Sequence, residues 1–273
     1  MTARVEHLVT SGTFSLDGQT FDVDNNVWII GDDEEVIVVD APHDADAIAE
    51  AVGDRTVVAI ACTHAHDDHV RYAPELGERL SAQVLLHPED RVLWDLTHAR
   101  HEPDGTLREG QVLEVAGTRL HVLHTPGHAS NHLCYLLEEE RTLFTGDHVM
   151  QGSTVVINPP DGDMAVYLLS LNELLNEPLD WLAPGHGFLV AQPHAVLRAL
   201  IAHRGKREAK VLAALHSHGP GPLEGLVKAV YADVPPVLHG VAQRSLWAHL
   251  LKLQGEGRAV LDADDRWAAA SVA

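Results

Sequence analysis

The segment Thr63-His64-Ala65-His66-Asp67-Asp68-His69 has the strongest chemical signature in the chain. It directly follows the β-branched run from Thr56 to Ala61, which predicts a buried strand. A turn at the end of that strand can bring several side chains to one point. Imidazole nitrogens together with carboxylate oxygens suit a borderline metal such as Zn²⁺. Because the adjacent Asp68 and His69 point in different directions, two neighbouring metal ions accommodate these groups more easily than one.

Three later turns each carry one further candidate ligand. They are Thr125-Pro126-Gly127-His128, Thr145-Gly146-Asp147 and Ala183-Pro184-Gly185-His186-Gly187, each placed directly after a short apolar run. A glycine beside each candidate ligand lets the backbone approach a site closely. Any one of these turns is ordinary. As an ordered set behind the first segment, they favour a metal site over a polar turn in a chain that contains 20 histidines.

Together these motifs resemble the metallo-β-lactamase superfamily of binuclear metallohydrolases, over roughly Asn25 to Val190. The resemblance implies an α/β fold, a four-layer αββα sandwich with the site on loops at one edge. It also implies the ligand sets: His64, His66 and His128 for one metal ion, Asp68, His69 and His186 for the second, and Asp147 as the bridge. Zinc is the expected metal, with iron and manganese as alternatives.

Other residues refine the resemblance. True β-lactamases commonly use a Cys in the second site and are exported, whereas Cys62 and Cys134 stand at no ligand position, so antibiotic hydrolysis is not expected.

The stretches Gly146 to Met150 and Pro160 to Tyr167 resemble the lactamase-like protein 2 subgroup, which contains endoribonucleases and shares its architecture with fungal polyketide thioesterases. The first histidine-rich segment equally resembles bacterial glyoxalase II-like thioesterases. The subgroup implies a small C-terminal winged-helix-like domain.

Charge and composition support a division of the chain into residues 1–193 and 194–273. The formal net charge is −21 overall, near −24 before His194 and near +3 from His194 onward. Such a shift often marks a domain boundary, and Leu182 to Val196 contains two Pro and two Gly. Helical spacing from His194 to Ser217 and from Val241 to Gln254, with a hairpin after Arg258, predicts the winged helix.

The catalytic part is predicted to alternate short strands with helices. The expected strands are Val27 to Ile30, Glu35 to Asp40, Thr56 to Ala61, Gln83 to His87, Gly117 to Thr125, Leu133 to Leu137 and Thr142 to Thr145. The expected helices are Asp44 to Val52, Arg71 to Leu80 and Asp163 to Leu175. This order predicts two packed sheets with helices outside them.

Composition also limits partners and location. A strongly negative chain is a poor non-specific binder of nucleic acids or anionic membranes, since both are polyanions. No apolar run reaches the roughly 20 residues of a membrane helix, and no signal peptide is visible at the start. Two cysteines form no disulfide framework. We therefore expect a cytoplasmic enzyme with a small-molecule substrate. The sequence leaves its oligomeric state open, and a dimer is plausible.

Two functions remain open at this stage. The preferred one is hydrolysis of a small ester, thioester or lactone, because two divalent ions lower the pKa of a bridging water to about 7 and so supply a hydroxide. Asp68 is the expected proton acceptor, and His132 and Tyr167 are candidate substrate contacts. The alternative is a single-strand-specific endoribonuclease of the lactamase-like protein 2 type. That alternative needs a basic track, and the only candidate is Arg198, Arg204, Lys206, Arg207 and Lys210.

Overall fold

A computed structural model describes residues 3–16 and 19–270, which fall into two compact units. The first unit comprises Met1–Thr125, Asn131–Thr154 and Pro178–Pro193, and the second comprises Pro126–Ser130, Val155–Glu177 and His194–Ala273. The division predicted from the sequence and the division into compact units therefore share a boundary between residues 193 and 194. The second unit, however, also takes two segments that the sequence assigns to the catalytic domain. The domain limits 1–193 and 194–273 stay a prediction.

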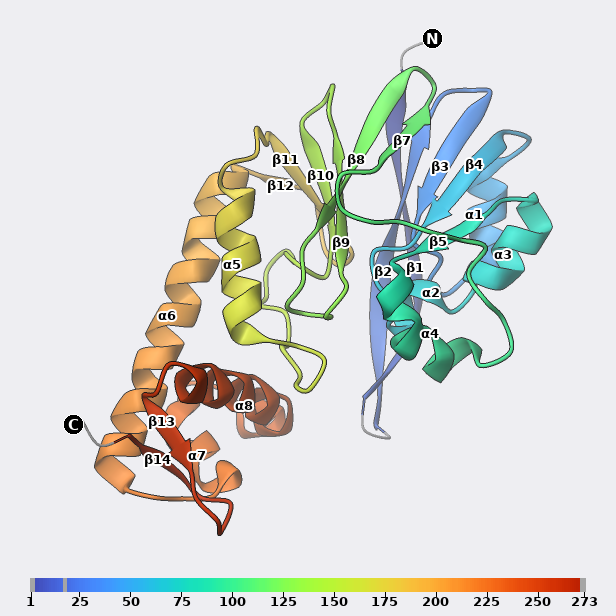
Figure 1. The fold of residues 1–273 in the computed structure, drawn as a ribbon. Helices are drawn as coiled ribbons and strands as arrows, with labels where there is room; N and C mark the ends of the chain where they lie inside the picture. The colour runs from blue at the N-terminus through green and yellow to red at the C-terminus, as the bar shows by residue number, and fades with distance from the viewer. Residues whose placement is uncertain (1–2, 17–18, 271–273) are drawn as a thin grey trace. The chain divides into compact units, whose positions relative to one another are not determined.

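The first unit begins with a six-stranded mixed sheet (Figure 1). Its strands, in spatial order, are β1 (Arg4–Leu16), β2 (Gln19–Gly31), β3 (Glu35–Val39), β4 (Thr56–Ala61), β5 (Val84–Leu86) and β6 (Gly105–Thr106). The first three strands pair antiparallel, and β3 to β6 run parallel. The carboxyl ends of β3 and β4 therefore reach the same edge of the sheet.

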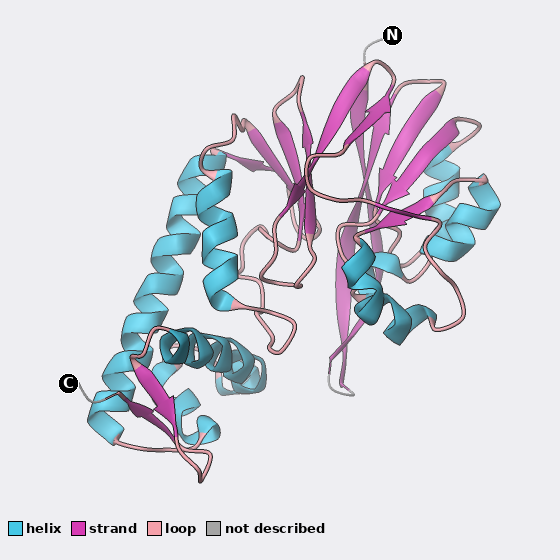
Figure 2. Cartoon of the chain, viewed as in Figure 1, coloured by secondary structure: helices cyan, strands magenta, loops and turns pink. Residues whose placement is uncertain are grey.

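Helices cover one face of this sheet (Figure 2). They are α1 (Ala45–Val52), α2 (Asp67–Val70), α3 (Ala73–Leu80) and α4 (Arg91–His98), with a 3₁₀ turn at Pro88–Asp90. Parallel strands need a crossover, which explains α1 and α3. Asp44 caps α1 by accepting from the Ala47 amide at 2.9 Å, and Gly53 ends it with φ +64°.

The second sheet of this unit is also six-stranded. In spatial order it contains β12 (Val190–Ala191), β11 (Trp181–Pro184), β10 (Thr142–Gly146), β9 (Leu133–Leu137), β8 (Thr118–His124) and β7 (Val112–Val115). Only β10 and β11 run parallel. Trp28 and Ile30 of the first sheet pack with Tyr135 and Phe144 of the second in one buried cluster. The two sheets therefore enclose a shared apolar core.

The second unit is mainly helical. It contains α5 (Met164–Leu174), α6 (Pro193–His218), α7 (Leu223–Val230), a 3₁₀ turn at Pro236–Leu238, α8 (His239–Gly255) and the antiparallel hairpin β13 (Ala259–Leu261) and β14 (Trp267–Ala269). Leu215, Leu226, Leu246 and Trp267 pack in its core. Three helices followed by a two-stranded wing match the predicted winged-helix arrangement.

Candidate metal centre

The site is built where β3 and β4 end side by side. Asp40, one residue past β3, is 2% exposed. Its two carboxylate oxygens accept from the Thr63 amide at 2.7 Å and from the Thr63 hydroxyl at 2.9 Å. These bonds fix the backbone at the point where the chain leaves β4 and enters the histidine-rich segment.

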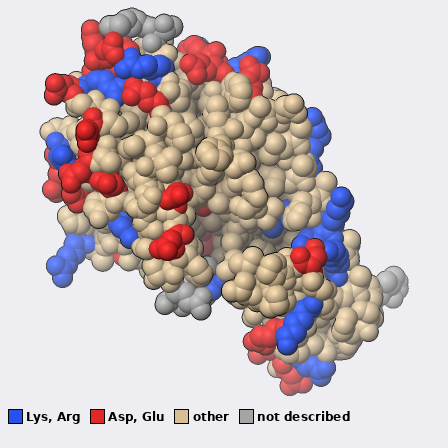
Figure 3. All heavy atoms as spheres, turned by 180° about the vertical axis from the view of Figure 1, so that it is seen from behind, with Lys and Arg blue, Asp and Glu red and all other residues tan. Residues whose placement is uncertain are grey.

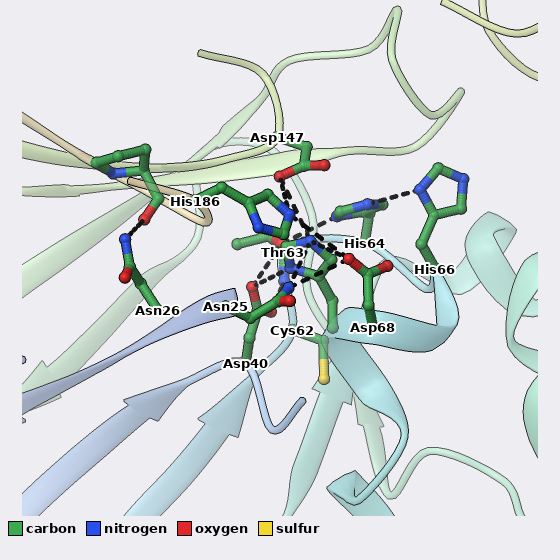
Figure 4. Close-up of polar contacts among 12 residues, drawn as sticks. Asn25, Asn26, Asp40, Cys62, Thr63, His64, His66, Asp68, Asp147 and His186 are labelled. Carbon is green, nitrogen blue, oxygen red and sulfur yellow. Dashed lines mark hydrogen bonds and ion pairs between the residues drawn. The ribbon is translucent and has the colours of Figure 1, made fainter. Parts of the chain in front are cut away.

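A single helical turn then directs two ligand candidates inward. The turn α2 starts after His66, and the His69 amide donates to the His66 carbonyl at 2.9 Å. Asp68 and His69 are consequently buried, at 4% and 1% exposure. Figure 4 shows Asp68, His64 and His186 gathered beside Asp147, with His66 farther out.

Asp147 and His186 reach this place from the second sheet. Asp147 follows β10 and His186 follows β11, and these strands pair in parallel. A Cβ on Gly146 would stand 2.7 Å from Thr63 Oγ1, and one on Gly185 would stand 2.7 Å from His69 Cε1. Both positions therefore require glycine for the two strand ends to approach the first sheet.

The donor atoms of these side chains have the spacing of metal ligands. Asp147 Oδ1 lies 3.4 Å from His69 Nε2 and 3.2 Å from His186 Nε2. Asp68 Oδ2 lies 3.5 Å from His186 Nε2 and 3.8 Å from His69 Nε2. Ligands about 2.0–2.2 Å from a tetrahedral ion stand roughly 3.3–3.6 Å from one another. The four observed distances, 3.2–3.8 Å, bracket this range, so the donor set is close to the arrangement that a divalent metal requires.

Among the described residues of this unit, two sets of three side chains bring their ligand atoms close enough together to hold a metal ion. They are His64, His69 and Asp147, and Asp68, His69 and His186, each with its ligand atoms within 4.8 Å of one another. His69 belongs to both sets, so it lies at the centre of the cluster. The cluster includes five of the seven residues that the resemblance implies.

Each imidazole is oriented through its other nitrogen. His69 Nδ1 lies 2.8 Å from Asp40 Oδ2, and His186 Nδ1 lies 2.8 Å from the Asp24 carbonyl oxygen. His64 Nδ1 lies 3.1 Å from Thr63 Oγ1. In metal sites such outer partners fix the tautomer and direct Nε2 to the ion.

Sequence reasoning did not single out these partners. Asp40 carried the same strand-end signal as His64, since it follows the apolar run Val36 to Val39, but it has no motif of its own. Asn25 had no signal. It lies in β2, donates Nδ2 to Asp68 Oδ2 at 3.2 Å, and its Oδ1 is 2.8 Å from His43 Nε2.

The electrostatics of the cluster favour a cation. Burial alone would lower the pKa of His186, but Asp147 and Asp68 outweigh it and raise that pKa to about 10. Burial likewise opposes protonation of His69, and the carboxylates Asp147, Asp68 and Asp40 still hold its pKa well above the usual value. A site that draws protons onto two buried imidazoles offers the same stabilisation to a metal ion.

The other predicted residues lie as follows. His66 Nδ1 is 2.9 Å from His64 Nε2. His132 is buried, with Nδ1 3.1 Å from Thr125 Oγ1 and Nε2 accepting from the Asp147 amide at 3.1 Å, so it positions the Asp147 turn. In the second unit, His128 Nδ1 is 2.8 Å from the Val156 carbonyl oxygen, and Tyr167 is buried in α5. Substrate contact by His132 and Tyr167 stays a prediction.

Comparison with known proteins identifies the family. Residues 21–186 match the model of the metallo-beta-lactamase superfamily, and residues 223–267 match that of the beta-lactamase associated winged helix domain. An atrochrysone carboxyl ACP thioesterase of Aspergillus chevalieri is 30% identical over 92% of this chain and 80% of its own.

Solved structures agree. A metallo-beta-lactamase family protein of Thermus thermophilus is similar with a TM-score of 0.75 and 25% identity, over 96% of this chain and 98% of its own. The protein TTHA1623 in a di-iron-bound form is 28% identical, with a TM-score of 0.55, over 66% of this chain and 93% of its own.

The chain therefore belongs to the metallo-β-lactamase superfamily and is a hydrolase of that superfamily with an associated winged-helix domain. The predicted family and fold class are confirmed: the fold is mixed α/β, with two β-sheets and a C-terminal winged helix. Members of this superfamily bind divalent metals, in agreement with the His and Asp cluster. Among the described residues, no helix is long and apolar enough to cross a membrane.

Proposed function

We propose that this protein hydrolyses an acyl thioester, with an acyl group carried on an acyl carrier protein as the substrate class. The observation that carries the proposal is the cluster of His69, His186, Asp68 and Asp147, whose donor atoms lie 3.2–3.8 Å apart. The relative from Aspergillus chevalieri supports the thioester, since its name assigns it an ACP-bound carboxylic substrate. The broader classes predicted from the sequence, small esters, lactones and glyoxalase II-like thioesters, serve as competitors in the test.

In this proposal the ligand sets are those implied by the sequence. His64, His66 and His128 would hold one ion, Asp68, His69 and His186 would hold the other, and Asp147 would be the bridging ligand. Zinc is the proposed metal, and the di-iron form of TTHA1623 makes iron the first alternative. When bound, such ions polarise the thioester carbonyl and supply a hydroxide at neutral pH.

The protein's own groups then have separate tasks. Burial alone would raise the pKa of Asp68, but the charge of His69 and the bond from His186 outweigh it and keep that pKa below the usual value. Asp68 is therefore held as a carboxylate and accepts the proton of the attacking water. Asn25, donating to Asp68 Oδ2, fixes the direction in which that carboxylate points. Asp40 keeps the His69 imidazole in place through Nδ1.

The basic track required by the endoribonuclease alternative is mostly absent from the surface. Arg204 and Arg207 of α6 are 3% and 8% exposed, and Lys210 pairs with Asp233 at 2.9 Å. Among the described residues of the track, only Arg198 and Lys206 remain exposed without an ion pair. On the face in Figure 3, Lys and Arg side chains stand in separate groups among Asp and Glu. The structure therefore offers this alternative little electrostatic support.

Two measurements test the proposal. Elemental analysis of the purified protein should find two transition-metal ions per chain, falling to one or none in His66→Ala. The metal-loaded enzyme is then offered acyl-ACP, acyl-CoA, acyl-glutathione and lactone substrates, with thiol release or ring opening as the readout. We expect turnover of acyl-ACP. A metal-loaded enzyme that releases no thiol from any thioester would overturn the proposal.

A further inference from the structure

The segment Val155–Asn158 of the second unit is held from two directions. Arg204 of α6 donates Nη2 to the Val155 carbonyl oxygen. The next carbonyl, that of Val156, lies 2.8 Å from His128 Nδ1. Arg244 of α8 donates Nη1 to Asn158 Oδ1 at 3.0 Å. Arginines of the C-terminal helices and the candidate ligand His128 thus bond to the same short stretch of chain.

Arg204 has an unusual environment for a cation. Its side chain is 3% exposed, and it makes no ion pair with any described residue. Its guanidinium lies over the Tyr167 ring, 5.5 Å from the ring centre. Burying a guanidinium without a carboxylate is costly, and the contacts that offset the cost here go to Val155 and Tyr167. Both belong to the part of this unit that supports His128.

The turn that carries His128 rests on the same support. The Asp163 amide donates to the Gly127 carbonyl at 2.9 Å, and Ser170 Oγ donates to the Pro126 carbonyl at 2.8 Å. A Cβ on Gly127 would stand 2.3 Å from Tyr167 Cα, so the turn lies directly against the backbone of α5. The turn has little room to adjust if Tyr167 or Val156 moves.

We infer that Arg204, with a smaller contribution from Arg244, is a positioning residue that fixes the His128 imidazole for metal binding. The inference rests on the proposed function, in which His128 is a ligand. A ligating imidazole needs a fixed acceptor at its other nitrogen, and here that acceptor is the Val156 carbonyl. Arg204 holds the peptide one residue away, so it controls the direction of this carbonyl. This gives the C-terminal helices a part in metal binding.

The test compares Arg204→Leu with Arg207→Leu. Arg207 is a matched control: it is buried on the same helix, donates to a backbone carbonyl, that of Val230, at 2.7 Å, and lies over Tyr231 at 4.3 Å. Its contacts stay within the winged helix. Metal affinity is measured by titration against a chelator, and the cobalt-substituted protein is followed by its visible absorption spectrum.

We expect R204L to bind its weaker metal ion about tenfold less tightly, as is typical when an outer partner of a ligand is removed, and to show an altered cobalt spectrum. R207L should keep both the affinity and the spectrum even where its thermal stability falls. Arg204→Lys, which retains a cation and a donor, should recover most of the affinity. Arg244→Ala should give a smaller loss than R204L, and it carries the test if R204L does not fold.

His128→Ala separates the two possible failures. If H128A keeps two metals and an unchanged cobalt spectrum, the ligand assignment in the proposed function is wrong. If H128A loses a metal while R204L and R244A bind like the unmodified protein, only the role of Arg204 is overturned. Equal losses in R204L and R207L would also overturn it, because they would indicate general destabilisation.

Discussion

His69 of the first unit and His249 of the second are equally buried, at 1% and 0% exposure, yet their surroundings are opposite. Carboxylates surround His69 and raise its pKa despite burial. Burial and then Arg204, Lys252, Arg207 and His203 lower the pKa of His249 to about 3. Burial alone therefore does not decide the charge of a histidine; the sign of the neighbouring charges does. The carboxylates of the first unit thus stabilise a positive charge on His69, whereas the cations around His249 in the second unit disfavour one on that imidazole.

The largest effect on metal content and activity is expected when a carboxylate beside His69 loses its charge. Asp147→Asn keeps the shape of the side chain but removes the charge beside His69 and His186. Loss of a direct ligand should exceed the roughly 10–100-fold loss of affinity typical of an outer partner. We expect one metal or none by elemental analysis and activity reduced more than about 100-fold. Two tightly bound metals in D147N would show that Asp147 is not a ligand.

Asp40→Asn should have the next largest effect. The change weakens the bond to His69 Nδ1 and the two bonds to Thr63 without replacing a proposed ligand. Metal affinity should fall about 10–100-fold, measured by chelator competition. Asp44→Asn, which alters only the cap of α1, is the matched control and should leave affinity unchanged. An equal effect of D40N and D44N would contradict a specific role for Asp40.

The ligands and their outer partners differ in how well the sequence alone predicts them. The ligand motifs are local, because one strand end and one helical turn place His64, Asp68 and His69. The outer partners Asp40 and Asn25 come from separate strands. Their pairing with the ligands depends on sheet order, which the sequence does not display locally.

The same distinction applies to the fold. Local signals predicted β4 at Thr56–Ala61 and a helix from Asp44 to Val52, and the structure has α1 there with Asp44 as its cap. The hairpin β1–β2 was missed apart from Val27–Ile30, because its thirteen-residue strands carry many polar and exposed residues and are defined by pairing with each other. The short helix α4 was missed too, since Trp94 is the only residue that it buries completely.

A smaller effect is expected from the cationic surroundings of His249. The pKa of His249 is about 3 in the folded protein and near 6.5 in the unfolded chain. The neutral imidazole therefore contributes its full share to the free energy of unfolding above pH 6.5, and this contribution is lost as the pH falls toward 3. When the pH is lowered from 7.5 to 5, the free energy of unfolding of His249→Leu should decrease by about 2 kcal/mol less than that of the unmodified protein. Urea unfolding at the two pH values measures this. The exposed His216→Leu should behave like the unmodified protein, and equal losses in all three would refute the assignment.

The smallest effect concerns the two buried thiols, Cys62 and Cys134. Burial raises the pKa of Cys134 to about 12 and that of Cys62 well above its usual value. Neither thiol should react with a disulfide reagent at pH 8 until urea unfolds the chain, when both should react. Cys134→Ala should retain activity within about twofold, because Cys134 is no ligand in the proposed site. Rapid labelling of the folded protein by the disulfide reagent would contradict the predicted protection of the two thiols.

The direct pairing of β10 with β11 has a consequence for how such an enzyme can change over evolution. Phe144 lies opposite Ala183 in that parallel pair, so the positions of Asp147 and His186 are set by hydrogen bonds between adjacent strands. The chain between them makes a long excursion that includes α5. The strand pairing therefore lets this excursion change in length or sequence over evolution while Asp147 and His186 stay in place.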